Sequence, residues 1–340
     1  MVCSMGDTEA RPALLATIGG TPVVRLERLA GPDVAELWVK LESTNPTGSY
    51  KDRMALAMIE GAERSGRLRA GQTVVEYTGG STGSSLAFVC AVKGYTLRIV
   101  TSDAFAPEKL ATMRAFGAEL DVIPSPAGIT PDLIPSMMRR AAEIVDEVDG
   151  FATDQFNNRD MIDGYAELGR ELFDQLDGRL DGFCAYVGTA GCFLGATRAL
   201  SSRLPSLHRV VVEPGESAVI SGGAPGTHHI EGGGVGFWPP LLSRDDFDEV
   251  RAVPEGEAMA MAMRVAREEG LLCGPSTGAN IVAGLDLARR LGPGARVATP
   301  HVDSGLKYLA GGLHAPEAAG GAAVRPERSR ARRRARVHPG

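Results

Sequence analysis

Short apolar runs of strand length alternate along this chain with longer segments in which apolar residues recur every three or four positions. The first run, residues 37–41, leads into turn residues 45–48 and then into a helical pattern that ends near Gly66. Ser49, with Asp52 three positions later, predicts a capping box at the start of this helix. The pattern therefore predicts a strand, a turn and a helix in direct succession.

Lys51 falls in the first turn of that predicted helix. The backbone dipole makes a helix N-terminus positive, so a charged lysine is unfavourable there. A lysine that is neutral, or bonded to an aldehyde cofactor as a Schiff base, fits this position better. A solvated lysine on a helix surface is the alternative that Lys51, taken alone, leaves open.

From residue 73 onwards, apolar runs and helical patterns alternate in two series, on either side of about residue 155. The predicted strands cover residues 73–77, 97–100, 120–123, 183–187, 210–212 and 297–299. The predicted helices cover residues 84–92, 107–116, 132–147, 193–202, 257–269 and 278–290. Such alternation produces parallel sheets covered by helices, and ligands bind beyond the carboxyl ends of their strands. We therefore expect an α/β protein of two lobes with a cleft between them.

The composition is that of a globular chain with an acidic body. Of 340 residues, 44% are hydrophobic and 23% charged, and the net charge is −6. Residues 321–340 contain seven Arg and one Glu, a charge of +6, so residues 1–320 carry −12. An acidic body gives no support for a nucleic-acid partner. The arginine-rich stretch 330–336 predicts a disordered basic tail over residues 311–340.

The five cysteines are odd in number, widely spaced and without a C-x-x-C pair, which is typical of a reducing, cytoplasmic setting. The six histidines show no ligand spacing, so we expect no metal. The N-terminus has no targeting signal. No apolar run approaches the ~20 residues that span a bilayer, so we expect no membrane partner.

Three segments rich in glycine or other small residues lie where ligands of an α/β sheet bind. They are residues 78–83, 188–192 and 273–280. Small residues let backbone N–H groups approach an anion, and a helix N-terminus adds a favourable dipole. The loop 188–192 suits a phosphate and the loop 78–83 suits a substrate carboxylate, whereas ordinary structural turns are the alternative for each.

The segment around Lys51 resembles the asparagine-glycine-serine-x-lysine-aspartate-arginine segment of pyridoxal phosphate (PLP) enzymes of the cysteine synthase and cystathionine β-synthase family. The resemblance runs from Ile18 to about Tyr308 and includes the three segments above, the pair Gln155-Phe156 and the loop 229–237. It implies fold type II, related to tryptophan synthase β: an α/β, two-lobed, three-layer parallel-sheet fold with the active site in the interdomain cleft.

The resemblance implies a role for each matching residue. Lys51 carries PLP and is the catalytic base. The implied cofactor-binding residues are Lys51, Ser81, Gly188, Thr189, Ala190, Gly191, Cys192 and Ser276. The implied substrate-binding residues are Thr78, Gly79, Gly80, Ser81, Thr82, Gln155 and Gly232. Three positions depart from the family pattern: Ser81 replaces an asparagine, Ala190 a glycine and Cys192 a threonine.

The resemblance also implies four segments. Residues 13–50 pack with the C-terminal lobe, 51–155 form the smaller lobe with the PLP lysine and substrate loop, 156–310 form the larger lobe with the phosphate loop, and 311–340 are the tail. A cytoplasmic homodimer is expected.

The predicted reaction is β-replacement on an activated L-serine, O-acetyl- or O-phosphoserine, through an aminoacrylate. A sulfur nucleophile then gives L-cysteine or a related amino acid. Ser276 would meet the pyridine nitrogen of PLP, and a neutral hydroxyl there weakens the electron sink, which favours β-elimination over transamination. The alternatives are β-elimination as in a dehydratase, a specialised synthase with a nitrogen nucleophile, and a catalytically silent binding protein.

Overall fold

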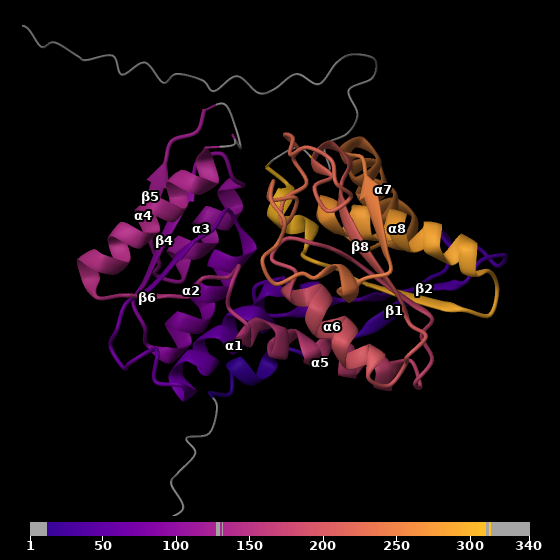
Figure 1. The fold of residues 1–340 in the computed structure, drawn as a ribbon, viewed down its shortest axis with the longest axis horizontal. Coiled ribbons are helices and arrows are strands. Elements are labelled where there is room, and N and C mark those ends of the chain that lie inside the picture. The colour runs from indigo at the N-terminus through magenta and orange to yellow at the C-terminus, as the bar shows by residue number, and fades with distance from the viewer. Residues whose placement is uncertain (1–11, 127–129, 131, 311–312, 314–340) are drawn as a thin grey trace, which may run out of the picture.

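The computed structural model describes residues 12–126, 130, 132–310 and 313, which form two α/β lobes lying side by side (Figure 1). The larger sheet has the strand order β1-β2-β10-β7-β8-β9, and the smaller sheet β5-β4-β3-β6. Neighbouring strands pair in parallel except β1 with β2. The strands are β1 (Val23–Leu26), β2 (Glu36–Lys40), β3 (Val74–Tyr77), β4 (Leu97–Ser102), β5 (Glu119–Ile123), β6 (Phe151–Ala152), β7 (Gly182–Tyr186), β8 (His208–Pro214), β9 (Glu249–Val253) and β10 (Arg296–Pro300).

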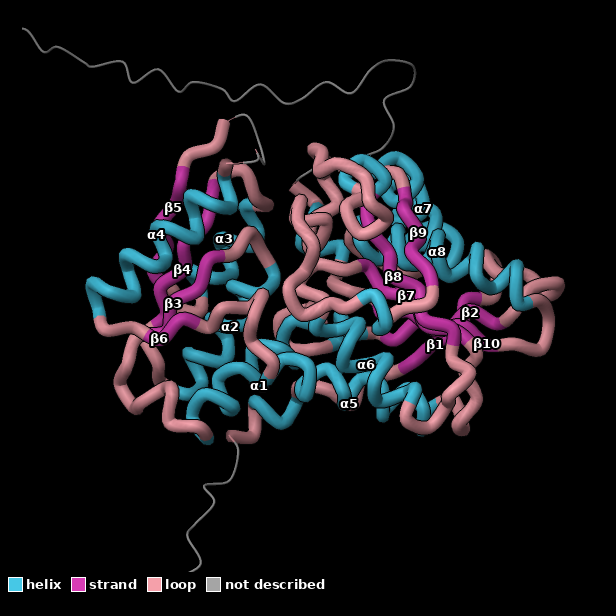
Figure 2. Tube along the Cα trace, in the orientation of Figure 1, coloured by secondary structure: helices cyan, strands magenta, loops and turns pink. Residues whose placement is uncertain are grey.

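Helices cover the sheets and also join the lobes, as the tube in Figure 2 shows. The helices are α1 (Lys51–Arg64), α2 (Ser81–Lys93), α3 (Pro107–Ala115), α4 (Leu133–Val148), α5 (Asp160–Gln175), α6 (Gly191–Ser201), α7 (Glu255–Glu269) and α8 (Pro275–Leu291). Helix α4 packs on β3 and β4, and α8 packs on β7, β8 and β10. Helix α1 contacts both α2 and α5, so it links the two halves of the chain.

The hydrophobic pattern explains how these helices are buried. In α4, Leu133, Met137, Ala141 and Ile144 are buried at three- or four-residue spacing, which places them on one face. In α8, burial extends along most of the helix, because it packs between the larger sheet and α7. The amphipathic period therefore predicts a helix with one buried face, such as α4. The position of α8 depends instead on packing on two sides.

A buried ionic network holds the N-terminal end of α1 against the larger lobe. Lys40 on β2 is fully buried, and its Nζ lies 2.6 Å from Glu171 Oε2 on α5. Arg53 bridges the same Glu171, at 2.8 Å, and Glu42 Oε2, at 2.7 Å. Removing one partner of such a network leaves a buried charge uncompensated, at a cost of ~3–5 kcal/mol. The network therefore fixes the helix turn that carries Lys51.

The predicted strands and helices are present, with ends shifted by up to three residues. Strand β1 and helix α5 are not among the elements predicted with bounds, and neither are strands β6 and β9. Strand β6 has only two residues, and β9 is an edge strand in which charged and apolar side chains are mostly half-buried. Neither produces a clear apolar run, because each depends on pairing with a neighbour.

The predicted capping box between Ser49 and Asp52 is wrong. Helix α1 begins at Lys51 after Tyr50, without a side-chain cap. Asp52 instead accepts hydrogen bonds from the backbone N–H and hydroxyl of Thr47, at 2.8 and 2.5 Å. The carboxylate thus stabilises the preceding turn, and Ser49 Oγ accepts from the backbone N–H of Lys51 at 3.2 Å.

The predicted tail and most of the chain's first residues lie outside the described part. The boundaries of the four predicted segments stay a prediction. The antiparallel pair β1–β2 does join the larger sheet, because β2 pairs in parallel with β10.

Candidate active site

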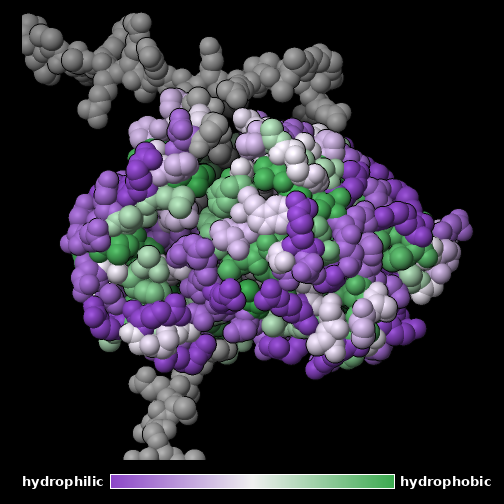
Figure 3. All heavy atoms as spheres, in the orientation of Figure 1, coloured by the Kyte–Doolittle hydropathy of each residue, from purple (hydrophilic) through white to green (hydrophobic). Residues whose placement is uncertain are grey.

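A cavity of about 750 Å³ lies between the lobes, where strand ends from both sheets meet. Its wall includes Lys51, the loop after β3, the loop after β7 and the glycine-rich loop around Gly232. On the face in Figure 3, polar side chains cover most of both lobes, and apolar side chains form smaller patches on each lobe and between them. The cavity therefore occupies the place where α/β sheets bind ligands.

Lys51 is the first residue of α1 and lines the cavity. It is only 6% exposed, and its Nζ lies 4.9 Å from the centre of the Tyr50 ring. Burial lowers its pKa to about 8. Such a lysine is neutral more often than a solvated one and is a better nucleophile towards an aldehyde. The structure thus gives Lys51 the environment that its place in the sequence predicted.

The loop between β7 and α6 contains the predicted phosphate-binding residues. Gly188 and Thr189 line the cavity, whereas the other three predicted residues are buried and are not among its lining residues. Ala190 has φ 68°, in the left-handed region that favours glycine. Cys192 offers only a weak thiol donor, and burial raises the pKa of that thiol above its usual range. The loop opens α6, so its backbone N–H groups lie at a helix N-terminus.

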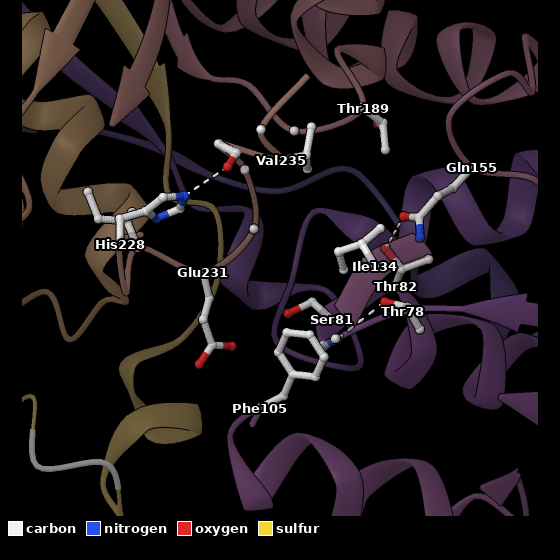
Figure 4. Close-up of a pocket in the computed structure, with 18 of the residues that line it drawn as sticks. Thr78, Ser81, Thr82, Phe105, Ile134, Gln155, Thr189, His228, Glu231 and Val235 are labelled. Carbon is white, nitrogen blue, oxygen red and sulfur yellow. Dashed lines mark hydrogen bonds between the residues drawn. The ribbon is translucent and has the colours of Figure 1, made fainter. Parts of the chain in front are cut away.

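The predicted substrate loop lies along one side of the cavity, and all of its residues from Thr78 to Thr82 line it. Packing leaves no room for a side chain at Gly79 and little at Gly80. A Cβ on Gly79 would lie 2.2 Å from the Phe105 ring, and one on Gly80 would lie 2.9 Å from Lys109 Cδ. Figure 4 shows this loop with Phe105 beside it, and the Gly80 N–H donates to Thr78 Oγ1 at 3.2 Å.

Thr82 and Gln155, which are far apart in the sequence, meet in this wall. Thr82 Oγ1 donates to Gln155 Oε1 at 2.9 Å (Figure 4), and Gln155 Nε2 donates to the Tyr77 carbonyl at 3.0 Å. A fully buried carboxylate, Glu76, accepts from the Gln155 backbone N–H at 3.1 Å and from Thr153 Oγ1 at 2.6 Å. Glu76 therefore positions the segment that carries Gln155. Burial raises the pKa of Glu76 to about 7.

Ser81 is engaged by protein partners. Its Oγ donates to Asp303 Oδ2 at 3.2 Å and accepts from Lys307 Nζ at 3.4 Å. The hydroxyl therefore lies in a polar cluster at the edge of the cavity, together with residues from the segment after β10. Its predicted role next to the cofactor ring stays a prediction.

The residues present fit PLP. Ser276, at the start of α8, is fully buried, and its Oγ has no hydrogen-bond partner among the described residues. Ser276 is not among the residues that line the cavity, and a pyridine nitrogen that reaches its hydroxyl would satisfy it. Lys51 would hold the aldehyde carbon, and the N–H groups of residues 188–192 would hold the phosphate. Among the described residues, no group of three or more His, Cys, Asp or Glu is arranged to bind a metal.

Sequence reasoning gave no individual role to several cavity residues, among them Lys109, Glu231, Asp303 and Tyr308, although Glu231 lies within the predicted loop 229–237. Asp303 follows the predicted last strand, so the rule of strand carboxyl ends could have identified it. Lys109 and Glu231 carry no such signal, because they are 122 residues apart and meet only in the fold.

The fold and the site together define a PLP enzyme with two parallel-sheet lobes and a buried lysine in the cleft. Residues 14–303 match the family model of the pyridoxal-phosphate dependent enzymes. A cysteine synthase of Staphylococcus aureus (strain Mu50 / ATCC 700699) is 40% identical over 299 residues, covering 87% of this chain and 95% of that protein.

Two solved structures are similar throughout. The cysteine synthase from Entamoeba histolytica superposes with a TM-score of 0.85 at 31% identity, covering 94% of this chain and 96% of that one. An O-ureido-L-serine synthase gives a TM-score of 0.83 at 33% identity, covering 91% and 96%. The chain belongs to the pyridoxal-phosphate dependent enzyme family. The predicted family, fold type and cofactor are confirmed, and the relatives support the predicted β-replacement that makes cysteine from an activated serine.

Proposed function

We infer that the protein catalyses β-replacement on an activated L-serine, O-acetyl- or O-phosphoserine, with a sulfur nucleophile, to give L-cysteine or a related amino acid. One observation carries this proposal: a buried lysine lines the same cavity as residues of two loops that we predict to bind anions, one suited to a phosphate and one to a carboxylate. The cysteine synthase relatives support the same reaction.

PLP, when bound, supplies an electron sink for bond breaking at the α-carbon of the amino acid. The protein's residues supply position and proton transfer. The loop from Thr78 to Thr82, with Gln155 beside it, holds the substrate carboxylate and so orients the α-carbon towards Lys51. Lys51 Nζ removes the α-proton as general base, and its pKa of about 8 suits both uptake and release of a proton near neutral pH.

Ser276 sets how strongly the PLP ring can withdraw electrons from the substrate. A neutral hydroxyl is a weaker partner for a protonated ring nitrogen than a carboxylate, so the sink is moderate. A moderate sink favours substrates whose β-substituent leaves easily, as acetate or phosphate does. This is the reason to expect an activated serine rather than serine itself.

A cytoplasmic homodimer belongs to the same proposal. The thiols of Cys90, Cys184 and Cys192 are free and buried, which suits a reducing compartment. No helix in the described part is long and apolar enough to cross a membrane. Sedimentation at several concentrations tests the dimer.

A substrate panel tests the reaction. O-acetyl-, O-phospho- and unmodified L-serine are each combined with sulfide, thiosulfate and homocysteine, and the amino-acid products are identified by mass spectrometry. The proposal expects a sulfur amino acid from an activated serine. Pyruvate as the main product would support β-elimination instead, and the absence of turnover with PLP bound would support a binding protein. A synthase with another nucleophile would consume the serine donor only when that nucleophile is supplied.

A further inference from the structure

A buried cation that the reaction above does not use lies in the cavity wall. Lys109, in the first turn of α3, is 2% exposed and borders the substrate loop. A Cβ on Gly80 would lie 3.3 Å from its Nζ. A lysine in the first turn of a helix opposes the helix dipole, so its charge there needs compensation from elsewhere.

That compensation comes from the other lobe. Lys109 Nζ lies 2.5 Å from Glu231 Oε2 and 3.9 Å from Asp303 Oδ2. It also donates to Tyr308 Oη at 3.0 Å, and Tyr308 in turn donates to Asp303 at 2.8 Å. The anion nearest to Lys109 is therefore the carboxylate of Glu231, which lies on the opposite side of the cavity.

The two carboxylates differ in how firmly they are held. Asp303 is 2% exposed and is tied to Ser81 and Tyr308. The Glu231 side chain is 20% exposed and extends from its loop into the cavity wall (Figure 4). It precedes Gly232, whose φ is 100°, so the adjoining backbone has the freedom of glycine. Glu231 is thus the partner that can leave.

If the Glu231 carboxylate turns towards solvent, Lys109 keeps one hydroxyl and a carboxylate 3.9 Å away. Lys307, bonded to Ser81, adds a second positive charge to the same edge of the cavity. Lys109 and Lys307 would then share Asp303, while Asp52 also acts on Lys307. Both lysines lie next to the N-terminus of α2, which also favours negative charge. The vacated position suits an oxyanion.

We propose that Lys109 binds an oxyanion carried by the group that is lost or added at the β-carbon, and that Glu231 occupies this position until the oxyanion displaces it. The proposal rests on the β-replacement reaction and adds a specificity site to it. The oxyanion has two possible sources, the phosphate of an O-phosphoserine donor and the sulfonate-like oxygens of a thiosulfate nucleophile.

The test uses the PLP-loaded enzyme, in which the phosphate loop at residues 188–192 is filled by the cofactor. Inorganic phosphate is titrated into the protein by calorimetry. Lys109→Met should weaken phosphate binding by at least about tenfold, because a hydrogen bond to a charged group is lost. Glu231→Gln should strengthen it by up to about fivefold, because a competing carboxylate is removed.

Lys93→Met is the matched control. Lys93 Nζ lies 2.7 Å from Glu63, and Glu63 also accepts from Tyr95 Oη at 3.0 Å, so this is a similar Lys–Glu–Tyr group outside the cavity. Its loss should leave phosphate binding at the wild-type value. Phosphate binding that is unaffected by Lys109→Met would place the ion in the loop after β3 and overturn the proposal.

Two ratios of kcat/KM identify the source of the oxyanion. The first compares O-phosphoserine with O-acetylserine at fixed sulfide, and the second compares thiosulfate with sulfide at fixed O-acetylserine. Lys109→Met should lower one of these ratios by about tenfold, and Glu231→Gln should raise the same ratio. If Lys109→Met does not fold, the increase in phosphate affinity and in the kcat/KM ratio expected for Glu231→Gln still tests the proposal.

The proposal is overturned if Glu231→Gln weakens phosphate binding, since that is the behaviour of a purely structural ion pair, or if both ratios stay at the wild-type value. Failure of the wild-type enzyme to make a sulfur amino acid from either activated serine with sulfide, thiosulfate or homocysteine would overturn the underlying reaction. The calorimetric titration would still test the Lys109 site.

Discussion

Gly188 packs against the carbonyl oxygen of Gly232, so that a Cβ on Gly188 would lie 2.4 Å from that oxygen. The contact joins the predicted phosphate loop to the glycine-rich loop that borders the cavity. Both loops line the same space, and neither backbone can move towards the other. The position of one loop therefore depends on the absence of a side chain on the other.

Gly188→Ala should displace the phosphate loop. Overpacking against a backbone atom costs ~1–3 kcal/mol, so PLP affinity should fall by about tenfold or more and the melting temperature should drop. Gly256→Ala is the control, since a Cβ there meets nothing within 4 Å on the exposed start of α7, and that variant should be as stable as the wild type or more so. Titration of apoenzyme with PLP, followed by absorbance, measures the difference. Equal PLP affinity in both variants would show that the contact does not position the loop.

Ala190→Gly should stabilise the same loop. An alanine at φ 68° costs ~1–2 kcal/mol, and glycine would remove most of that cost while adding some chain entropy, so a net gain of ~0.5–1 kcal/mol is expected. Ala111→Gly, at an exposed position on α3, should instead destabilise by ~1 kcal/mol. Urea unfolding of the apoenzymes measures both, and a loss of stability in Ala190→Gly would contradict the strained backbone.

Glu76 should make stability depend on pH. Its folded pKa of about 7 lies above the ordinary value of 4.5, so the folded state holds the proton where the unfolded state has lost it. Its favourable contribution is therefore fully present below about pH 4.5 and is lost as the pH rises through about 7. Unfolding free energies at pH 5 and pH 8 should differ less in Glu76→Gln than in the wild type. An equal difference in both proteins would mean that Glu76 is ionised throughout this range.

Ser81→Asn should shift specificity. The serine hydroxyl is shorter than the family's asparagine amide and is held by Asp303 and Lys307. We predict that this leaves room near the reacting carbon. A hydrogen bond to a charged cofactor oxygen contributes ~1.5–3 kcal/mol. If the asparagine restores this hydrogen bond, the preference between substrate pairs should change by roughly tenfold to a hundredfold. The variant should gain on O-acetylserine with sulfide relative to O-phosphoserine with thiosulfate. If the ratio of kcat/KM values for the two substrate pairs is the same in Ser81→Asn and in the wild type, Ser81 does not determine specificity.

The sequence allowed prediction of those parts of the site that lie at strand ends. Thr78 and Thr189 each follow a strand whose apolar run is visible, and parallel strands bring such ends to one edge. Lys51 was predictable because its segment resembles the lysine motif of the family, whereas a lysine at a helix start, which conflicts with the dipole, occurs at Lys109 as well. These features are local, and the fold brings them together in the way that α/β sheets generally do.

The remaining features depend on long-range contacts or on competition between partners. Lys109 meets Glu231 across the two lobes, and no local pattern encodes that meeting. Asp52 was expected to cap its own helix, but Thr47 offers both a backbone N–H and a hydroxyl to the same carboxylate. Strand β9 exists because β8 pairs with it, which its own half-polar sequence does not reveal.

We propose that Lys51 holds PLP. Two other buried lysines, Lys40 and Lys109, are held in ion pairs with Glu171 and Glu231, whereas no ion pair of Lys51 is found in the described part of the chain. Borohydride reduction of the PLP-loaded enzyme, followed by peptide mass spectrometry, measures the site directly. We expect the reduced cofactor on the peptide that contains Lys51, with no label in Lys51→Ala. Cofactor fixed to Lys40, Lys93 or Lys109 instead would contradict it.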